Sequence, residues 1–380
     1  MQISIVGGGI TGLTAALALE KAGINTKVYE KAPQLSEVGA GIWMQPNAMK
    51  VLDYLGIGEK VRQVGRELEV AEITDPNLNS FQKINPQMVR DQSGNKIVSI
   101  HRARLQKVLH DSLPEETINL GKEYLGHKAK NGKVYIKFAD QEIETDVLIG
   151  ADGINSRVRA NLFPHSATRY SGQTSWRGIT KIEMPSPLQN VGRELWGKGV
   201  RFGFSQISPE EVYWFAVAQD KAGSKDDPDK LKGRLKKMFY NFHPFVLEII
   251  DEASSNEIIR ADIYDLKRLS TWHQHQVCLV GDAAHATTPN MGQGGCQGVE
   301  DGYFMGKLLS STDNYPEAFT RFEQIRRSKV DYVVNNSWRF GQFAHHGLGQ
   351  AFLKLMIKIT PENVMASQMQ KLYRVDDELR

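Results

Sequence analysis

Residues 3–30, ISIVGGGITGLTAALALEKAGINTKVYE, decide the fold of this chain. They predict an apolar strand, a G-x-G-x-x-G turn, a helix from Leu13 to Ala22, and a second strand that ends in an acid. Such a turn lets the backbone approach a pyrophosphate, and the acid accepts ribose hydroxyls. The alternative is a glycine-rich turn in an α/β protein that binds no nucleotide. We expect an adenine dinucleotide at Gly7, Gly9, Gly12, Glu30 and the adjacent Lys31.

A second segment, Gln276–Asp301 (QVCLVGDAAHATTPNMGQGGCQGVED), indicates the other half of a ligand site. An apolar strand that ends in Gly281-Asp282 places one carboxylate at the carboxyl edge of a sheet, where α/β folds bind ligands. Backbone N–H groups at Gly292, Gly294 and Gly295, where a helix begins, suit negative charge. The segment therefore predicts a ligand with a polyol on one side and an electron-rich ring on the other.

Length and composition narrow the class of protein. A chain of 380 residues is long enough for two or more core-bearing units. The net charge of +3 is too small to indicate nucleic acid or a membrane surface as a partner. No apolar run is long enough to span a bilayer, and the N-terminus is an expected strand rather than a signal peptide, so we expect a cytoplasmic protein. The two cysteines, Cys278 and Cys296, indicate neither a disulfide framework nor a metal site.

Three motifs in order carry a family resemblance: GGGITG near the start, ADGINSR in the middle and GDAAHATTPNMGQGG near the end. With these motifs, about residues 1–335 resemble the single-component FAD-dependent hydroxylases, which include para-hydroxybenzoate, salicylate and urate hydroxylases and zeaxanthin epoxidase. The resemblance implies FAD, with Glu30 at the adenosine ribose and Gly281-Asp282 at the ribityl chain. It also implies Arg102 near the FAD phosphates, and Asp152 at both FAD and the nicotinamide cofactor.

The resemblance also implies the fold. We expect an α/β protein, α+β in its second domain: a Rossmann-like FAD-binding domain with an interleaved antiparallel-sheet substrate domain and a C-terminal helical tail. Apolar Leu348, Phe352, Leu355 and Met356 in the tail are expected to cover a core. The predicted division is 1–67, 101–169 and 269–335 for the FAD-binding domain, 68–100 and 170–268 for the substrate domain, and 336–380 for the tail.

The chemistry implied by the resemblance is that of a monooxygenase. NAD(P)H reduces FAD, and dioxygen adds at flavin C4a to give a hydroperoxide. One oxygen then passes to a small electron-rich substrate, aromatic or heterocyclic, by hydroxylation or epoxidation. The N–H groups near Gly292–Gly295 stabilise charge on the reduced ring. Pro289 either lines the flavin face or simply stiffens its loop, and His285 is expected to be a structural hydrogen-bonding residue rather than a redox-site residue.

Substrate contacts are expected from the strands of the second domain. Arg201 and Tyr213 match, by position and spacing, an arginine and a tyrosine that urate hydroxylases place at their substrate. The structural alternative is a salt bridge and an aromatic core residue. Arg177 follows a tryptophan where the urate pattern has an asparagine, which puts urate in doubt. It either contacts an acidic substrate or lies on a solvated strand.

Three other functions share parts of this pattern. A flavin reductase of the geranylgeranyl-reductase type has the same fold and consumes no dioxygen. A tetracycline-inactivating hydroxylase differs in its substrate pocket, and a flavin redox sensor shows negligible turnover. The sequence leaves open the substrate, the choice between NADH and NADPH, and whether the protein is a monomer or a homodimer.

Overall fold

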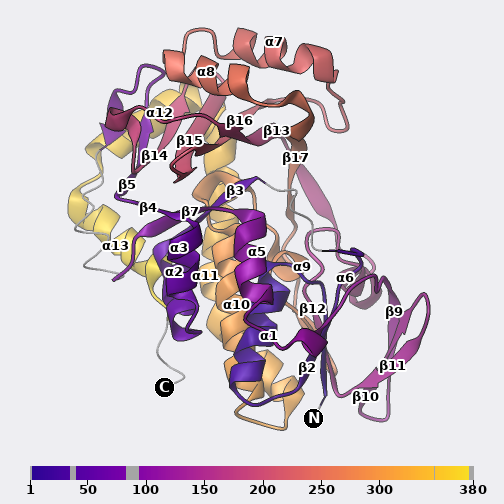
Figure 1. Cartoon of the computed structure of the whole chain (residues 1–380). Coiled ribbons are helices and arrows are strands. Elements are labelled where there is room, and N and C mark those ends of the chain that lie inside the picture. The colour runs from indigo at the N-terminus through magenta and orange to yellow at the C-terminus, as the bar shows by residue number, and fades with distance from the viewer. Residues whose placement is uncertain (1, 35–39, 83–93, 346, 376–380) are drawn as a thin grey trace.

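The computed structural model describes residues 2–34, 40–82, 94–345 and 347–375 (Figure 1). A six-stranded sheet, ordered β18-β19-β12-β1-β2-β8, forms the base of the molecule, and its neighbouring strands are parallel except β18 and β19. Because the parallel strands end at one edge, Gly7, Glu30, Ala151 and Gly281 come together there. The strands are β1 (Ile3–Val6), β2 (Thr26–Tyr29), β8 (Ile118–Asn119), β12 (Val147–Gly150), β18 (His273–Gln274) and β19 (Val277–Leu279).

Two helices that are far apart in the sequence pack together through small residues. Helix α1 (Ile10–Lys21) packs against α10 (Gly294–Leu309). A Cβ atom at Gly298 would lie 2.1 Å from Oγ1 of Thr11, and one at Gly306 would lie 2.4 Å from Cβ of Ala18. Only glycine permits this approach, which holds the start of α10 beside the first glycine turn.

A seven-stranded sheet, ordered β17-β13-β16-β15-β14-β5-β6, lies above the first. All neighbouring pairs are antiparallel, as predicted, except the parallel pair β5–β14. One face packs on α7 (Pro228–Met238) and α8 (Pro244–Glu252), at the top of Figure 1. The strands are β5 (Val70–Thr74), β6 (Ser80–Gln82), β13 (Thr168–Lys181), β14 (Val191–Trp196), β15 (Val200–Ser208), β16 (Glu211–Gln219) and β17 (Ile259–Leu266).

Two small sheets and short helices complete the body. The first small sheet contains β9 (Tyr124–Lys130), β10 (Lys133–Phe138) and β11 (Glu142–Thr145); the second contains β3 (Gly41–Met44), β4 (Arg66–Leu68) and β7 (Ile97–His101). Segment 68–100 thus contributes strands to two sheets, and its residues 83–93 lie outside the described part. The helices are α2 (Pro46–Tyr54), α3 (Gly58–Val64), α5 (Arg102–His110), α6 (Arg157–Leu162) and α9 (Asp282–His285).

The C-terminal part is helical, as predicted, but the four apolar residues of α12 that were expected to cover a core are exposed. Helix α11 (Tyr315–Ala344) runs through the predicted boundary at 335/336 and is followed by α12 (Gly347–Ile359) and α13 (Glu362–Tyr373). On α12, Leu348 is 91% exposed and Phe352 is 52% exposed. The prediction for these residues, and for Leu355 and Met356, was therefore wrong, because α12 packs by its other side on α11 and β6.

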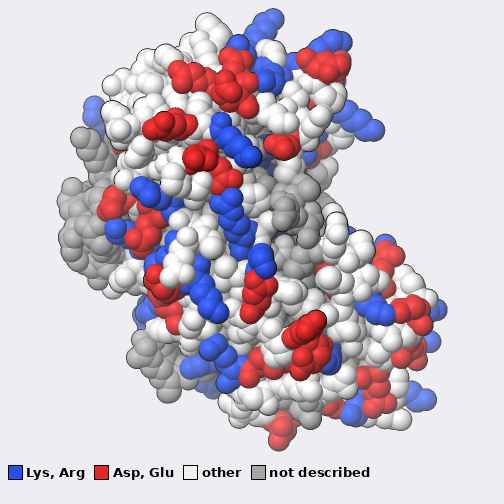
Figure 2. Space-filling model, in the orientation of Figure 1, with Lys and Arg blue, Asp and Glu red and all other residues white. Residues whose placement is uncertain are grey.

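On the face shown in Figure 2, basic and acidic side chains are interspersed. Among the described helices, none combines the length and the apolar character that a membrane crossing requires.

Candidate functional site: a cofactor cleft open to a sheet face

The first glycine turn has the geometry that the motif predicts. Gly7 has φ of +113°, which favours glycine, and a Cβ there would lie 2.4 Å from the carbonyl oxygen of Ala151. A Cβ at Gly12 would lie 2.0 Å from the carbonyl oxygen of Gly7, so this glycine lets the helix pack on the turn. Gly9 has no neighbouring atom within 4 Å of such a Cβ. The backbone at Gly9 is therefore bare, as a pyrophosphate contact requires.

Glu30 lies at the end of β2 beside this turn. One of its carboxylate oxygens accepts the N–H of Gly8 at 2.7 Å, and the other accepts the N–H of Ala32 at 2.9 Å. These bonds fix the carboxylate at the edge of a large cavity, which Glu30 helps to line. Exposed Lys31 lines the same end of the cavity.

Asp152 has a structural role that the sequence did not predict. Its Oδ1 accepts the hydroxyl of Ser156 at 2.5 Å, and its Oδ2 accepts two backbone N–H groups at the start of α6. The carboxylate thus caps a helix while lining the cavity. Arg159 of that helix is buried and donates to the carbonyls of Ala283 and Ile154 at 3.1 and 2.6 Å. This arginine ties the ADGINSR loop to α9.

A buried carboxylate, Asp301, holds the Gly281-Asp282 turn from below. It accepts the N–H of Gly281 at 2.8 Å, and its oxygens lie 2.6 Å from Nε2 of His285 and 2.8 Å from Nε of Arg326. Burial raises the pKa of Asp301, but His285 and Arg326 outweigh burial and lower it to about 2. The prediction that His285 is a structural hydrogen-bonding residue is confirmed. The sequence carried no local signal for Asp301 or Arg326.

Asp282 and Arg102 both line the cavity and carry opposite charges. Asp282 begins α9 and is exposed to the cavity, while the protein encloses it on its other sides. This enclosure raises its pKa, and His285 and Arg102 offset part of the rise. Arg102 begins α5 and has no side-chain hydrogen bond or ion pair with any described residue. Its guanidinium is therefore available to an anion.

The second glycine run forms a smaller donor site than predicted. Gly292 has φ of +61°, but its N–H donates to the carbonyl of Pro289 at 2.8 Å and is not free. Gly294 and Gly295 are the first residues of α10, where backbone N–H groups have no partner within the helix. Gln45 fixes the loop by donating to the carbonyl of Gly292 at 3.0 Å. Pro289 lies in this loop and lines the cavity.

One cavity of about 910 Å³ is lined by residues of both glycine turns, by Glu30, Arg102, Asp152 and Asp282, and by residues of the seven-stranded sheet. Arg201 lies at this junction and is only 2% exposed. It donates to Glu194 at 2.9 Å, to Asn290 at 2.6 Å and to Nε2 of His345 at 3.1 Å. The structural alternative considered for Arg201 is therefore present: it joins the sheet, the loop after Pro289 and the end of α11. Its contact with a substrate stays a prediction.

Tyr213 and Arg177 lie further along the same sheet face. The Tyr213 ring packs directly on Gly41, where a Cβ atom would lie only 2.2 Å from Cγ of the tyrosine. Burial raises the pKa of Tyr213 to about 12, and the charge of Arg177 offsets part of the rise, so the hydroxyl keeps its proton. The Nε of half-buried Arg177 is enclosed without a hydrogen-bond partner. Among the described residues, no hydrogen bond or ion pair involves this guanidinium, which lines the cavity.

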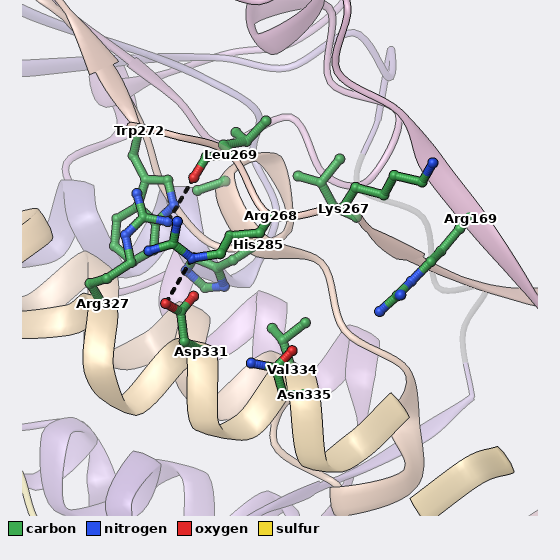
Figure 3. A pocket seen from close by; sticks show the side chains of 12 residues that line it. Arg169, Lys267, Arg268, Leu269, Trp272, His285, Arg327, Asp331, Val334 and Asn335 are labelled. Carbon is green, nitrogen blue, oxygen red and sulfur yellow. Dashed lines mark hydrogen bonds and ion pairs between the residues drawn. The ribbon is translucent and has the colours of Figure 1, made fainter. Parts of the chain in front are cut away.

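A second hollow, of about 150 Å³, lies on the other side of His285 (Figure 3). Its lining is rich in cations, and its three arginines have partners within the protein: Arg169 lies 2.7 Å from Asp265. Arg268 lies 2.9 Å from Asp331, and Arg327 donates to the carbonyl of Leu269 at 2.9 Å. The hollow lies where α11 packs against the loop after β17, and it is too small for a nucleotide.

The groups around the large cavity fit FAD. The bare backbone at Gly9 and the unpaired Arg102 suit the phosphates, and Glu30 suits the adenosine ribose. Asp282 offers an acceptor for a polyol, and the first N–H groups of α10 offer donors to an electron-rich ring. These groups come from segments more than 250 residues apart in the sequence, in the arrangement that the two glycine motifs predict.

Comparison with known proteins identifies the family. The model of the FAD binding domain family matches residues 1–337. Aurachin C monooxygenase/isomerase of Stigmatella aurantiaca is 38% identical over 343 residues, which cover 90% of this chain and 89% of the relative. FAD-dependent urate hydroxylase of Klebsiella pneumoniae is 30% identical and covers 88% of both chains. The crystal structure of Klebsiella pneumoniae HpxO with FAD and uric acid has a TM-score of 0.90 at 25% identity, covering 98% of this chain and 96% of its own.

These matches confirm the expected resemblance, the Rossmann-like fold and FAD as the cofactor. The chain belongs to the FAD binding domain family, among the FAD-dependent monooxygenases and hydroxylases.

Proposed function

We propose that this protein uses NAD(P)H and dioxygen to hydroxylate or epoxidise a small, electron-rich aromatic or heterocyclic substrate. The observation that carries the proposal is the continuity of the cavity. One space of about 910 Å³ runs from the nucleotide turn to a sheet face that bears Arg177, a cation without a hydrogen bond or ion pair to any described residue. A cofactor bound at the glycine turns therefore shares this space with a second molecule.

The cofactor end needs four groups with separate roles. We assign Glu30 to the adenosine ribose, Arg102 to the phosphates, Asp282 to the ribityl hydroxyls and the N–H groups at Gly294–Gly295 to the ring. When bound, FAD supplies the redox chemistry, accepting electrons from NAD(P)H and passing them to dioxygen. The expected parts of Lys31 and Asp152 in cofactor binding stay predictions.

Arg177, Tyr213 and Arg201 are the groups of the substrate end to which we assign roles. Arg177 offers free donors to an anionic or carbonyl oxygen, and protonated Tyr213 offers an O–H. Arg201 orients Glu194 and Asn290 through its three hydrogen bonds, so we assign it a positioning role beside its predicted substrate contact. These donors hold the ring oxygen and leave the ring's carbon atoms open to the cofactor.

The overall reaction balances without a further reagent. One substrate C–H bond, one dioxygen, one NAD(P)H and one proton give the hydroxylated product, water and NAD(P)+. The substrate carbon and NAD(P)H are oxidised, and both oxygen atoms of dioxygen are reduced. A cytoplasmic location, a monomeric or homodimeric state and the division into domains remain part of this proposal.

The test is substrate-stimulated oxidation of NAD(P)H with dioxygen uptake across a panel of phenols, purines and polyenes. We expect one class to stimulate both and Arg177→Gln to raise the KM for that class about tenfold or more while FAD content stays unchanged. A reduced product without dioxygen uptake would indicate the reductase alternative. FAD binding without turnover on any class would indicate a redox sensor.

A further inference from the structure

The cavity changes character along the seven-stranded sheet. A single row of directly paired residues crosses it, and every pair in the row comes from the strand register. An aliphatic residue stands at each end of the row. The cation lies next to one of them, the acid lies next to the other, and an aromatic residue and a glycine lie in the middle. From β17 to β5 it reads Ile259, Arg177, Phe215, Gly203, Glu194 and Ile73.

The middle of the row presents the ring of Phe215 to the cavity. A Cβ atom at Gly203 would lie 2.2 Å from Cζ of Phe215, so the Phe215 ring lies over the neighbouring strand instead of standing away from the sheet. Phe215 lines the cavity, with Tyr213 at 6.0 Å between ring centroids. This surface suits a planar ring, whose oxygen can reach Arg177 at one side.

The opposite end of the cavity is apolar. Ala71 and Ile73 of β5, Ile97 of β7, and Met369 and Leu372 of α13 line it. Ionisable groups here are paired: Glu72 lies 2.9 Å from Arg193, and Glu194 is held by Arg201. Helix α13 closes this end with the apolar side chains of Met369 and Leu372, beside the buried ring of Tyr373.

We propose that this end is a subsite for an apolar chain carried by the substrate. The substrate class is then an aromatic ring with an anionic or carbonyl oxygen at Arg177 and an aliphatic substituent that extends toward Met369 and Leu372. This assignment rests on the proposed function, because it places the ring in the space beside the cofactor. The C-terminal helix α13 acts as the specificity element for the chain.

The test measures binding without turnover. The oxidised, FAD-loaded protein is titrated with salicylate and with salicylates that carry a propyl, heptyl or pentadecyl chain, in the absence of NAD(P)H. Binding is read from the flavin absorbance and from the fluorescence of tryptophan, since Trp43 lines the cavity. We expect each added methylene to tighten Kd about threefold to fourfold until the subsite is full.

Variants locate the effect on α13. Met369→Ser and Leu372→Ser should remove most of the gain from the longer chains and leave the Kd of salicylate itself within about twofold. Met365→Ser, one turn earlier on the same helix and outside the cavity lining, is the matched control and should keep the gain.

Two results would overturn the inference. One is the absence of chain-length dependence in the unaltered protein, including no binding of any member. The other is an equal loss of the gain in Met365→Ser. Failure of the monooxygenase proposal is recognised separately, because it shows as missing NAD(P)H-dependent dioxygen uptake while the binding series, read by tryptophan fluorescence, still responds.

Discussion

Replacing Asp301 with asparagine tests how the flavin-side turn is held. Asp301 receives three donors: the N–H of Gly281 at 2.8 Å, His285 at 2.6 Å and Arg326 at 2.8 Å. Asparagine keeps the shape but has one acceptor oxygen, and its amide places donors against donors. Breaking a buried ion pair by removing one partner costs about 3–5 kcal/mol. Because Arg326 keeps Glu300, we expect a loss near 3 kcal/mol in the free energy of unfolding.

We expect Asp301→Asn to weaken FAD binding as well as stability. The N–H of Gly281 sets the turn that presents Asp282, and a hydrogen bond to a charged group contributes about 1.5–3 kcal/mol. A share of that energy fixes the turn in the FAD-bound state, so Kd for FAD should rise about tenfold. Urea unfolding followed by circular dichroism measures stability, and titration of the FAD-free protein measures Kd.

Asp111→Asn is the control for the charge change. Asp111 is half-exposed and paired with Lys107 at 2.7 Å, so its loss should cost less than about 1 kcal/mol and leave Kd for FAD unchanged. The reasoning is refuted if Asp301→Asn costs no more than this control, or if FAD binds to both variants equally well.

Three further predictions concern acid, the ribityl contact and the buried arginine. The pKa of Asp301 is about 2 in the folded state and 3.8 ordinarily, so ionised Asp301 contributes about 2 kcal/mol to the free energy of unfolding above pH 4. This contribution is lost as the pH falls toward 2. Unfolding measured over this pH range checks the loss, which Asp301→Asn should lack. Asp282→Ala should sharply weaken FAD retention; recovery of the variant with a full complement of FAD contradicts the assignment. Arg201→Lys keeps one charge but not three directed bonds, so urea unfolding should show a loss of about 2–3 kcal/mol with FAD still bound; unchanged stability contradicts the positioning role.

Local features of the site were predictable because their causes are local. The three glycines of the first turn follow from a fixed spacing, and the structure shows why each position excludes a side chain or bares the backbone. The strand that delivers Gly281 and the helix that begins at Gly294 follow from apolar runs and turn residues. Each of these local patterns spans fewer than thirty residues, and their order along the chain carried the resemblance that implied the fold.

Contacts between distant segments were not predictable. Asp301 is held by His285 and by Arg326, which lies 25 residues further along, and nothing in the spacing indicates the pairing. Arg201 gains three partners from three separate segments, so an apparent substrate residue is also a structural one. The N–H of Gly292 donates a hydrogen bond within its own loop, and only the backbone geometry shows this bond.

The most direct test of the central claim is the fate of dioxygen. The FAD-loaded protein is supplied with NAD(P)H, the substrate that stimulates oxidation most and oxygen-18-labelled dioxygen, and the product is examined by mass spectrometry. If the protein is a monooxygenase, each product molecule carries one labelled oxygen atom, and one dioxygen is consumed for each product molecule formed. A product that carries oxygen from water, or NAD(P)H oxidation that yields only hydrogen peroxide with every substrate class, would contradict it.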